Sequence, residues 1–149
     1  MTKLSPPYVL RKVEETDLGF VYSNWSRVFR EVPPMNMCPA AIFKPQQKKV
    51  IDCLLNTAKL LVACHPDDSD ELLGFICYEF VAEVLVVHWI HIKSIFQHQH
   101  IASDILKTLY PEMSSIIFTH NFREASKLRS KFNLVYDPFF IINRIKEQE

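Results

Sequence analysis

The stretch that decides the fold runs from Val86 to Tyr110 and reads VVHWIHIKSIFQHQHIASDILKTLY. Its first part is rich in β-branched and aromatic residues, which predicts a buried strand over Val84–Lys93. In its second part, apolar residues recur every three or four positions, which predicts a helix from about His98 to Tyr110 that Pro111 ends. A strand, a short polar turn and an amphipathic helix therefore follow one another.

The residues on either side of this stretch predict a mixed α/β domain with a mainly antiparallel sheet. Upstream we expect a strand over Tyr8–Val13, a helix over Asp17–Glu31 capped by Thr16, a proline-rich loop over Pro33–Pro45, a helix from Pro45 to Thr57, and strands over Lys59–His65 and Leu72–Phe80. Downstream we expect a strand over Ser115–Thr119, a helix over Arg123–Phe132, and one or two last strands from Val135–Tyr136 and Phe139–Ile145. The predicted order is β-α-α-β-β-β-α-β-α-β(-β), in a single domain over residues 1–149.

Composition excludes several classes of protein. The 149 residues carry 17 Lys and Arg against 17 Asp and Glu, and a net charge of zero argues against a nucleic-acid partner. The absence of an apolar run of membrane-spanning length and of a signal peptide predicts a cytoplasmic protein without a membrane partner. The four cysteines form no Cys-x-x-Cys pair, so we expect free thiols and no metal site.

The turn in the deciding stretch reads Gln97-His98-Gln99-His100-Ile101-Ala102. Together with the order of elements, it resembles the acyl-coenzyme A motif of GNAT (GCN5-related) N-acetyltransferases, in which a strand leads into Gln/Arg-x-x-Gly-x-Gly/Ala at the start of a helix. Gln97, Ile101 and Ala102 match, whereas His100 takes the place of the first glycine. The resemblance covers nearly the whole chain and implies a GNAT-like acyl-CoA N-acyltransferase fold, with acetyl-CoA as co-substrate. It implies as cofactor-binding residues Ile92, Gln97, His98, Gln99, His100, Ile101 and Ala102.

The motif has a physical basis. Consecutive backbone N–H groups at a helix N-terminus hold a pyrophosphate without needing positively charged side chains, and glycine lets the phosphates approach the backbone. His100 adds bulk there, although its imidazole can donate a hydrogen bond to a phosphate. The alternative is that this turn is an ordinary helix entry.

A second match with the family lies near the C-terminus, in the segment ASKLRSKFNL from Ala125 to Leu134. Ala125, Leu128 and Lys131 agree with the GNAT pattern Ala-x-x-Leu-Tyr-x-Lys-x-Gly-Phe. Arg129 takes the place of the tyrosine that often protonates the leaving thiolate. An arginine cannot donate a proton at neutral pH, but it can stabilise thiolate charge or hold a phosphate, so we expect Arg129 either to bind the cofactor or to be a solvated helix residue.

His88 is the candidate catalytic residue. It precedes Gln97 by nine residues, where some GNAT enzymes place the glutamate that deprotonates the amine through water, and a histidine can do the same work. The alternative is a hydrogen-bonded histidine of the core or of a groove. Because His88 and His91 are three residues apart on a strand, we expect them on opposite faces of the sheet, where they cannot form a metal-ligand pair.

Within the family, the chain resembles short phage-encoded GNAT-like proteins. The shared residues are Asp17, Leu18, Phe20 and Trp25, the segment Leu61–Asp67, and Val87, His88 and Trp89.

These observations predict an N-acetyltransferase that uses an acyl-CoA to modify an amine of an unknown acceptor. In this fold, the acceptor pocket is built mainly from the first helices and their loop, here Asp17–Pro45. The alternative is a catalytically degenerate GNAT-fold binding or inhibitory protein, phage-encoded and acting on a host protein. A third alternative is a homodimer with a structural role, paired through its C-terminal strands.

Overall fold

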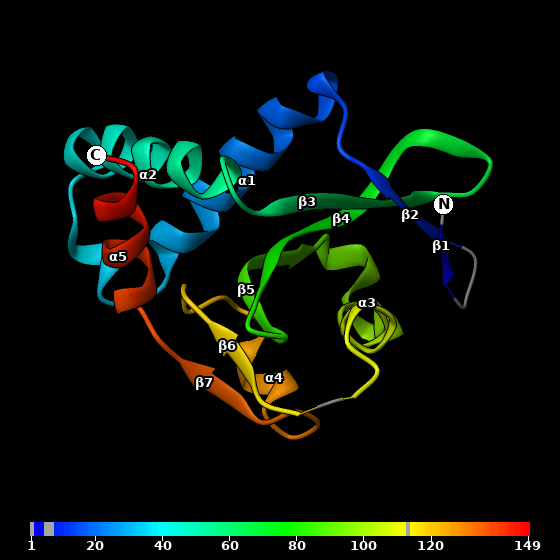
Figure 1. Cartoon of the computed structure of the whole chain (residues 1–149). Coiled ribbons are helices and arrows are strands. Elements are labelled where there is room, and N and C mark those ends of the chain that lie inside the picture. Colours follow the sequence, from blue (N-terminus) through cyan, green and yellow to red (C-terminus); the bar gives the residue numbers. More distant parts are fainter. Residues whose placement is uncertain (1, 5–7, 113) are drawn as a thin grey trace.

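The computed structural model describes residues 2–4, 8–112 and 114–149. Within these residues, the strands form one seven-stranded sheet in the order β1-β2-β3-β4-β5-β6-β7 (Figure 1). The strands are β1 (Thr2–Leu4), β2 (Tyr8–Lys12), β3 (Lys59–His65), β4 (Asp68–Val81), β5 (Val84–Ile92), β6 (Ile116–Phe118) and β7 (Leu134–Tyr136). The helices are α1 (Leu18–Glu31), α2 (Ala40–Leu55), α3 (Ile101–Leu109), α4 (Ala125–Leu128) and α5 (Phe139–Glu147). Short 3-10 helices are η1 (Glu15–Asp17), η2 (Met35–Met37) and η3 (Ser94–Gln99).

The sheet has two halves of different character. Strands β1 to β5 are antiparallel to their neighbours, so they form a meander. Strands β5, β6 and β7 are mutually parallel, and each connection in this half contains a helix, first α3 and then α4. The mixed, mainly antiparallel α/β fold predicted from the sequence is therefore confirmed.

Helices α1 and α2 lie on one side of the sheet and α3 lies on the other (Figure 1). The core between α1 and the sheet is aromatic. The ring of Trp25 stacks on that of Trp89 at 5.9 Å between centroids, and Phe29 packs edge-on against Trp89 at 5.7 Å. Burial of these large rings explains why α1 carries one apolar face.

The start of α1 differs from the prediction that Thr16 caps it. The backbone N–H of Glu14 donates instead to the Asp17 carboxylate at 2.8 Å, and Arg11 donates to the same carboxylate at 2.7 Å. Helix α2 begins at Ala40, so Pro45 lies inside the helix rather than in its first turn.

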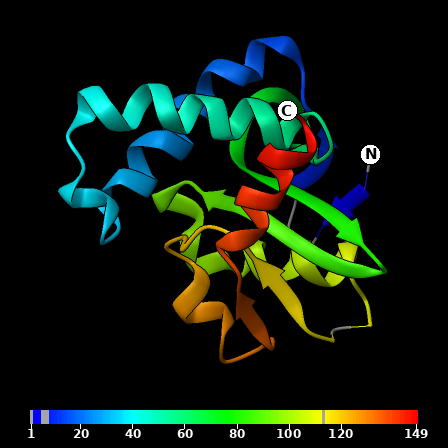
Figure 2. The same ribbon diagram turned by 60° about the vertical axis from the view of Figure 1, so that its left-hand side comes forward.

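The C-terminal segment differs most from the prediction. Phe139–Glu147, expected to be a strand, is helix α5, and the predicted helix Arg123–Phe132 is reduced to the four residues of α4. A short apolar run such as FFII does not distinguish a strand from a buried helix. Tertiary contacts favour the helix, because the chain after α5 lies against the end of α2 (Figure 2). There Gln148 bonds to Asn56 and to the carbonyl of Cys53.

Two further expectations concern composition. The four cysteines are free thiols, as predicted. Among the described residues, no helix combines the length and the apolarity needed to cross a membrane.

Candidate functional site

Strand β5 parts from β6 halfway along its length. The two strands pair only at Val86 with Ile117 and at Val87 with Phe118, and the N–H of Thr119 adds one bond to the Val87 carbonyl at 3.1 Å. Strand β5 nevertheless continues to Ile92. The pairing with β6 thus covers only the first part of this edge of β5.

A β-bulge in β5 lies where the strands part. Tyr78 of β4 pairs with Val87, and Cys77 pairs with Trp89, so His88 is the extra residue of β5. A bulge bends its strand and increases the local twist, which accounts for the divergence of β5 from β6.

Ile92 presents its backbone to this edge. The N–H of Lys93 donates to the Leu73 carbonyl of β4 at 2.8 Å, and backbone groups of successive residues in a strand alternate between its two edges. The N–H and C=O of Ile92 therefore point away from β4. The side chain of Gln97 lies at the same edge of β5, because its Nε2 donates to the Ile92 carbonyl at 3.1 Å.

The turn that follows passes through a left-handed residue directly before α3. His100, which takes the place of the family's glycine, is left-handed with φ 59° and ψ 24°, a conformation that glycine adopts most easily. The first bond of α3 runs from the N–H of Asp104 to the His100 carbonyl. The N–H groups of Ile101, Ala102 and Ser103 consequently have no acceptor within the helix.

These elements enclose a cavity of about 280 Å³. Its wall is formed by Ile92, Gln97, His100, Ile101, Ala102, Ser103, Glu124, Lys127, Leu128 and Lys131. Five residues that the family motif points to, Ile92, Gln97, His100, Ile101 and Ala102, therefore meet at one cavity. The side chains of His98 and Gln99, also predicted to bind the cofactor, lie outside what the structure describes.

Positive charge gathers at this cavity from residues near α4. Lys127 and Lys131 line it, and the Nζ of Lys131 lies 3.2 Å from Nδ1 of His100. Arg129 does not appear in the wall. It is exposed, and its guanidinium lies 5.7 Å from the centre of the Phe118 ring. Within the described residues, the structure thus places Lys127 and Lys131 at the cavity and Arg129 outside it.

Sequence reasoning did not single out Glu124 and Ser103. Both line the cavity and are buried, with exposed fractions of 7% and 4%. Glu124 Oε1 and Ser103 Oγ are buried atoms without a hydrogen-bond partner in the described part of the chain. The sequence signal that could have identified Glu124 is its helical spacing from Lys127, Leu128 and Lys131, which places all four residues on one face of a helical turn.

The carboxylate of Glu124 lies against the edge of β5. Burial raises the pKa of this carboxyl. The N–H groups of Glu124 itself and of Ile92, with the charges of Arg123 and Lys127, lower it, but the net pKa is above its usual value. The Ile92 N–H thus stabilises the charged form of this carboxylate, and both residues line the same cavity.

His88 lies in the core rather than in this cavity. Its side chain has an exposed fraction of 0%, and its ring is 5.5 Å from that of Phe140 in α5. Nε2 lies 2.7 Å from the Glu79 carboxylate, which Arg144 also binds, and Nδ1 lies 2.9 Å from the Thr119 hydroxyl. Both ring nitrogens are therefore engaged.

The hydrogen bonds of His88 belong to a buried chain that runs across β4, β5 and the end of β6. Gln47 Nε2 lies 3.1 Å from Nε2 of His120, and Nδ1 of His120 lies 3.2 Å from the Thr119 hydroxyl. When the Gln47 amide donates, His120 donates to Thr119, Thr119 donates to His88, and His88 donates to Glu79. Burial lowers the pKa of His120 to about 3, which agrees with a neutral His120 ring that donates through Nδ1.

His91 faces the same layer of helices as His88. It bonds to Asn24 of α1 through Nε2 at 3.0 Å, while His88 contacts Phe140 of α5. The expectation of opposite faces was wrong, because the bulge adds a residue and reverses the alternation beyond it.

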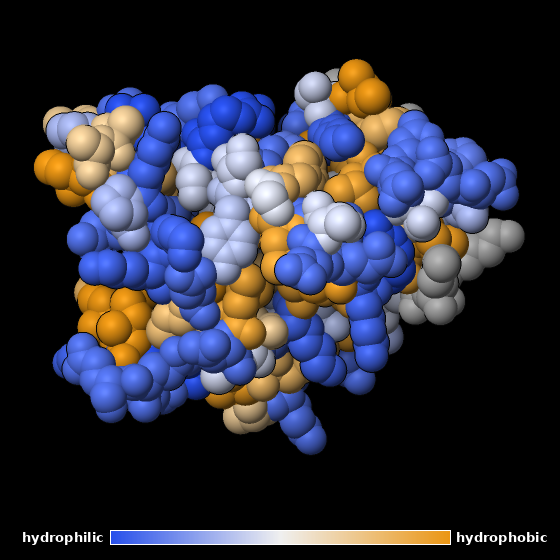
Figure 3. Space-filling view, turned by 90° about the horizontal axis from the view of Figure 1, so that it is seen from above, coloured by the Kyte–Doolittle hydropathy of each residue, from blue (hydrophilic) through white to orange (hydrophobic). Residues whose placement is uncertain are grey.

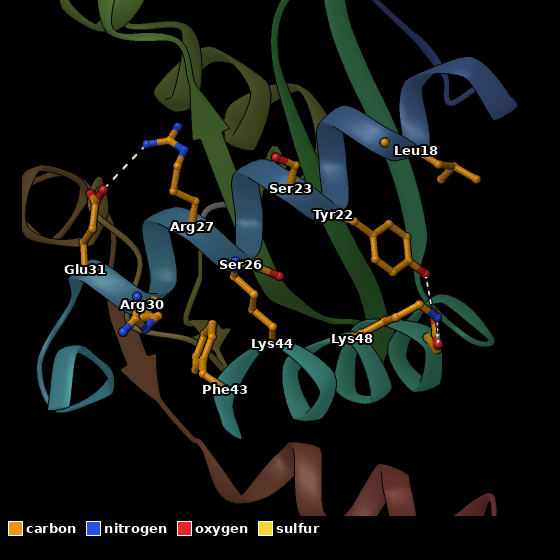
Figure 4. Close-up of a pocket in the computed structure, with 12 residues that line it drawn as sticks. Leu18, Tyr22, Ser23, Ser26, Arg27, Arg30, Glu31, Phe43, Lys44 and Lys48 are labelled. Atoms are coloured by element: carbon orange, nitrogen blue, oxygen red, sulfur yellow. Dashed lines mark hydrogen bonds and ion pairs between the residues drawn. The ribbon is translucent and has the colours of Figure 1, made fainter. Parts of the chain in front are cut away.

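A second cavity, of about 930 Å³, lies between α1 and α2. Figure 4 shows Tyr22, Ser23, Ser26 and Arg27 of α1 on one side and Phe43, Lys44 and Lys48 of α2 on the other. The carboxylates in its wall are paired, Asp52 with Tyr22 and Lys48, and Glu31 with Arg27. The face seen in Figure 3 is mostly hydrophilic, with hydrophobic residues between the polar ones.

Comparison with known proteins gives matches in structure alone. No protein-family model and no curated protein matches the chain. A functionally unknown conserved protein from Staphylococcus epidermidis ATCC 12228 superposes with a TM-score of 0.53 at 13% identity, over 85% of this chain and 48% of that protein. This chain thus spans about half the length of that protein. A possible acetyltransferase from Clostridium difficile 630 superposes with a TM-score of 0.50 at 13% identity, over 87% and 76% of the two chains.

A third similar structure is the PaiA N-acetyltransferase of Thermoplasma acidophilum in complex with coenzyme A. It has a TM-score of 0.45 and 17% identity over 68% of this chain and 69% of that one. The first two likenesses agree with the fold predicted from the sequence, and at their identities they concern the fold alone.

Proposed function

We propose that this chain binds an acyl-CoA along the free edge of β5 and at the start of α3, and transfers the acyl group to an amine. The observation that carries the proposal is the position of Ile92. Its backbone N–H and C=O point into a cavity that also receives the first N–H groups of α3. A ligand with a peptide-like arm and a phosphate end matches this pair of features.

The phosphate end fits the turn before α3. The N–H groups of Ile101, Ala102 and Ser103 can donate to phosphate oxygens, and the partial positive charge of the helix N-terminus favours an anion there. The side chains of Lys127 and Lys131 supply charge from the opposite wall. The residues present thus fit a pyrophosphate.

The amide arm fits the edge of β5. It would add to the strand beyond Val87, where β6 no longer pairs with it. Backbone N–H groups in this region would polarise the thioester carbonyl as the amine attacks. In the transfer, an N–C bond forms, the C–S bond breaks, the amine loses a proton and the thiolate leaves. The acceptor would enter from the α1–α2 cavity, which lies largely within the segment expected to bind it.

The role of His88 as general base stays a prediction. Its Nδ1 accepts from Thr119 in the hydrogen-bond chain described above, so the ring must turn or exchange that partner before it can take a proton. An H88Q variant tests this role, because glutamine retains hydrogen-bonding capacity but is no base. A loss of acyl transfer with unchanged CoA affinity would support it.

Isothermal titration with CoA and acetyl-CoA tests the binding step. We expect both ligands to bind, and the double variant K127A/K131A to bind about tenfold more weakly, since each exposed charge pair contributes up to about 1 kcal/mol. The matched control is K49A/K59A, which removes two exposed lysines outside the cavity wall. No binding at about millimolar ligand would refute the proposal.

The second candidate is a GNAT-fold binding or inhibitory protein that has lost catalysis, phage-encoded and acting on a host protein. The buried His88 and the exposed Arg129 in the family's tyrosine place favour it. It predicts no acyl transfer to any amine, together with a stable protein complex that H88Q leaves intact. Light scattering tests the homodimer, which stays a prediction.

A further inference from the structure

The cavity that Ile92 lines also holds a carboxylate of the protein. Glu124 lies in the wall of the proposed acyl-CoA cavity with an exposed fraction of 7%, and the Ile92 N–H stabilises its charged form. The Ile92 carbonyl accepts from the amide of Gln97. Both backbone groups that a peptide-like arm would use are thus faced by the protein's own side chains.

We infer that the Glu124 carboxylate competes with the ligand for the proposed acyl-CoA cavity, so that binding of the amide arm requires this carboxylate to leave the edge of β5. The inference rests on the proposed function, because it concerns the same cavity. It assigns Glu124 neither a proton-transfer step nor a contact with the reacting atoms. Glu124 is instead a residue that sets the affinity of the cavity for CoA.

The incomplete bonding of Glu124 supports this role. Its Oε1 is buried without a hydrogen-bond partner, although a buried carboxylate normally satisfies both oxygens. The carboxylate is therefore held less firmly than its burial suggests. Exchange for a ligand carbonyl would satisfy the Ile92 N–H and release the carboxylate to water.

Charge works in the same direction. The groups near the carboxylate are Arg123 and Lys127, with Lys131 and His100 elsewhere in the cavity wall. In its charged form, Glu124 attracts Arg123 and Lys127 and opposes the phosphates of the ligand. When protonated, it does neither, so the neutral form favours the ligand.

The affinity should consequently depend on pH. Since burial raises the pKa of Glu124, its carboxylate takes up a proton at a higher pH than an exposed glutamate does. Binding of CoA should then become tighter in the wild type. In E124Q this contribution is absent at every pH.

The experiment is titration of CoA into wild type, E124A, E124Q and the control E71A between about pH 6 and 8. E71A removes one exposed glutamate outside the cavity wall. We expect E124A to bind about tenfold more tightly than wild type at the upper pH, E124Q to lie between them, and E71A to match wild type. The ratio of E124Q to wild-type affinity should fall as the pH is lowered.

The outcomes separate the two proposals. Equal affinities of wild type and E124A, with measurable binding in both, would overturn the competitor role and leave the proposed function standing. Weaker binding in E124A would also overturn it, because Glu124 would then hold the ligand. An absence of binding in all four proteins would overturn the proposed function itself. E124Q, which keeps the side-chain shape, gives the answer if E124A does not fold.

Discussion

Gly74 of β4 offers a sharp test of how closely β4 packs against β5 beside the proposed acyl-CoA cavity. A Cβ built on Gly74 would lie 2.2 Å from the His91 carbonyl oxygen, 2.8 Å from Cδ1 of Ile92 and 3.0 Å from its Cα. Two of these three atoms belong to the backbone of β5. The substitution Gly74→Ala therefore forces the two strands apart at the residue that presents its backbone to the cavity.

The magnitude follows from these distances. Ordinary contact begins near 3.4 Å, so the His91 carbonyl must give way by about 1 Å, and no flexible side chain can absorb that shift. Overpacking of this kind costs about 3 kcal/mol at the upper end of its range. With a urea dependence of about 2 kcal/mol per molar, the unfolding midpoint should fall by about 1.5 M.

The chain's other glycine provides the control. Gly19 lies in the first turn of α1, and a Cβ there meets nothing within 4 Å. Gly19→Ala should raise the free energy of unfolding by up to about 1 kcal/mol, because alanine loses less backbone entropy in a helix.

Urea unfolding followed by circular dichroism measures both variants, and titration with CoA shows whether G74A also weakens binding. A G74A protein within about 0.5 kcal/mol of wild type would refute the close approach of β4 and β5 at His91.

Two further predictions concern titration. Burial raises the pKa of Glu79, but the hydrogen bonds from His88 and Arg144, with the charge of Arg144, lower it more, so the net pKa lies below its usual value. The stabilisation by this carboxylate is thus present above about pH 4.5 and is lost as the pH falls through the folded pKa. The E79Q variant should therefore have a lower urea midpoint than wild type at neutral pH, and the difference should close in acid. A difference in midpoint that does not depend on pH would contradict this prediction. Burial first, and then nearby cations, lower the pKa of His91 to about 4. Its imidazole resonance in NMR, assigned by its loss in H91N, should therefore titrate near pH 4. Titration near the usual histidine value of about 6.5 would show that the ring is exposed. Because the unfolded chain binds the proton more readily, this histidine reduces stability as the pH falls from 6.5 toward 4.

The elements with a strong local pattern were predictable. The strand ending near Lys93, the polar turn and the helix up to Tyr110 depend on residues close together in the chain, and the structure confirms them as β5, η3 and α3. Gln97, His100 and Ala102 line one cavity, and their binding of a cofactor stays a prediction.

The C-terminal elements were not predictable in the same way. FFII reads equally well as a strand or as part of a helix, and the segment after Arg123 begins with turns before its short helix. Arg144 contacts Glu79, 65 positions away, and such contacts lie outside any sequence window.

The sequence by itself determined the order of elements and the turn at Gln97–Ala102, because hydrogen bonds and apolar periodicity within one element act over a few residues. Only the tertiary structure decided that His88 is the bulged residue of β5, that both its nitrogens are engaged, and that Glu124 and Ile92 line one cavity. These features depend on the register between strands and on the approach of α4 to β5. Contacts between residues far apart in the chain form only when the whole core packs, and no local pattern encodes them.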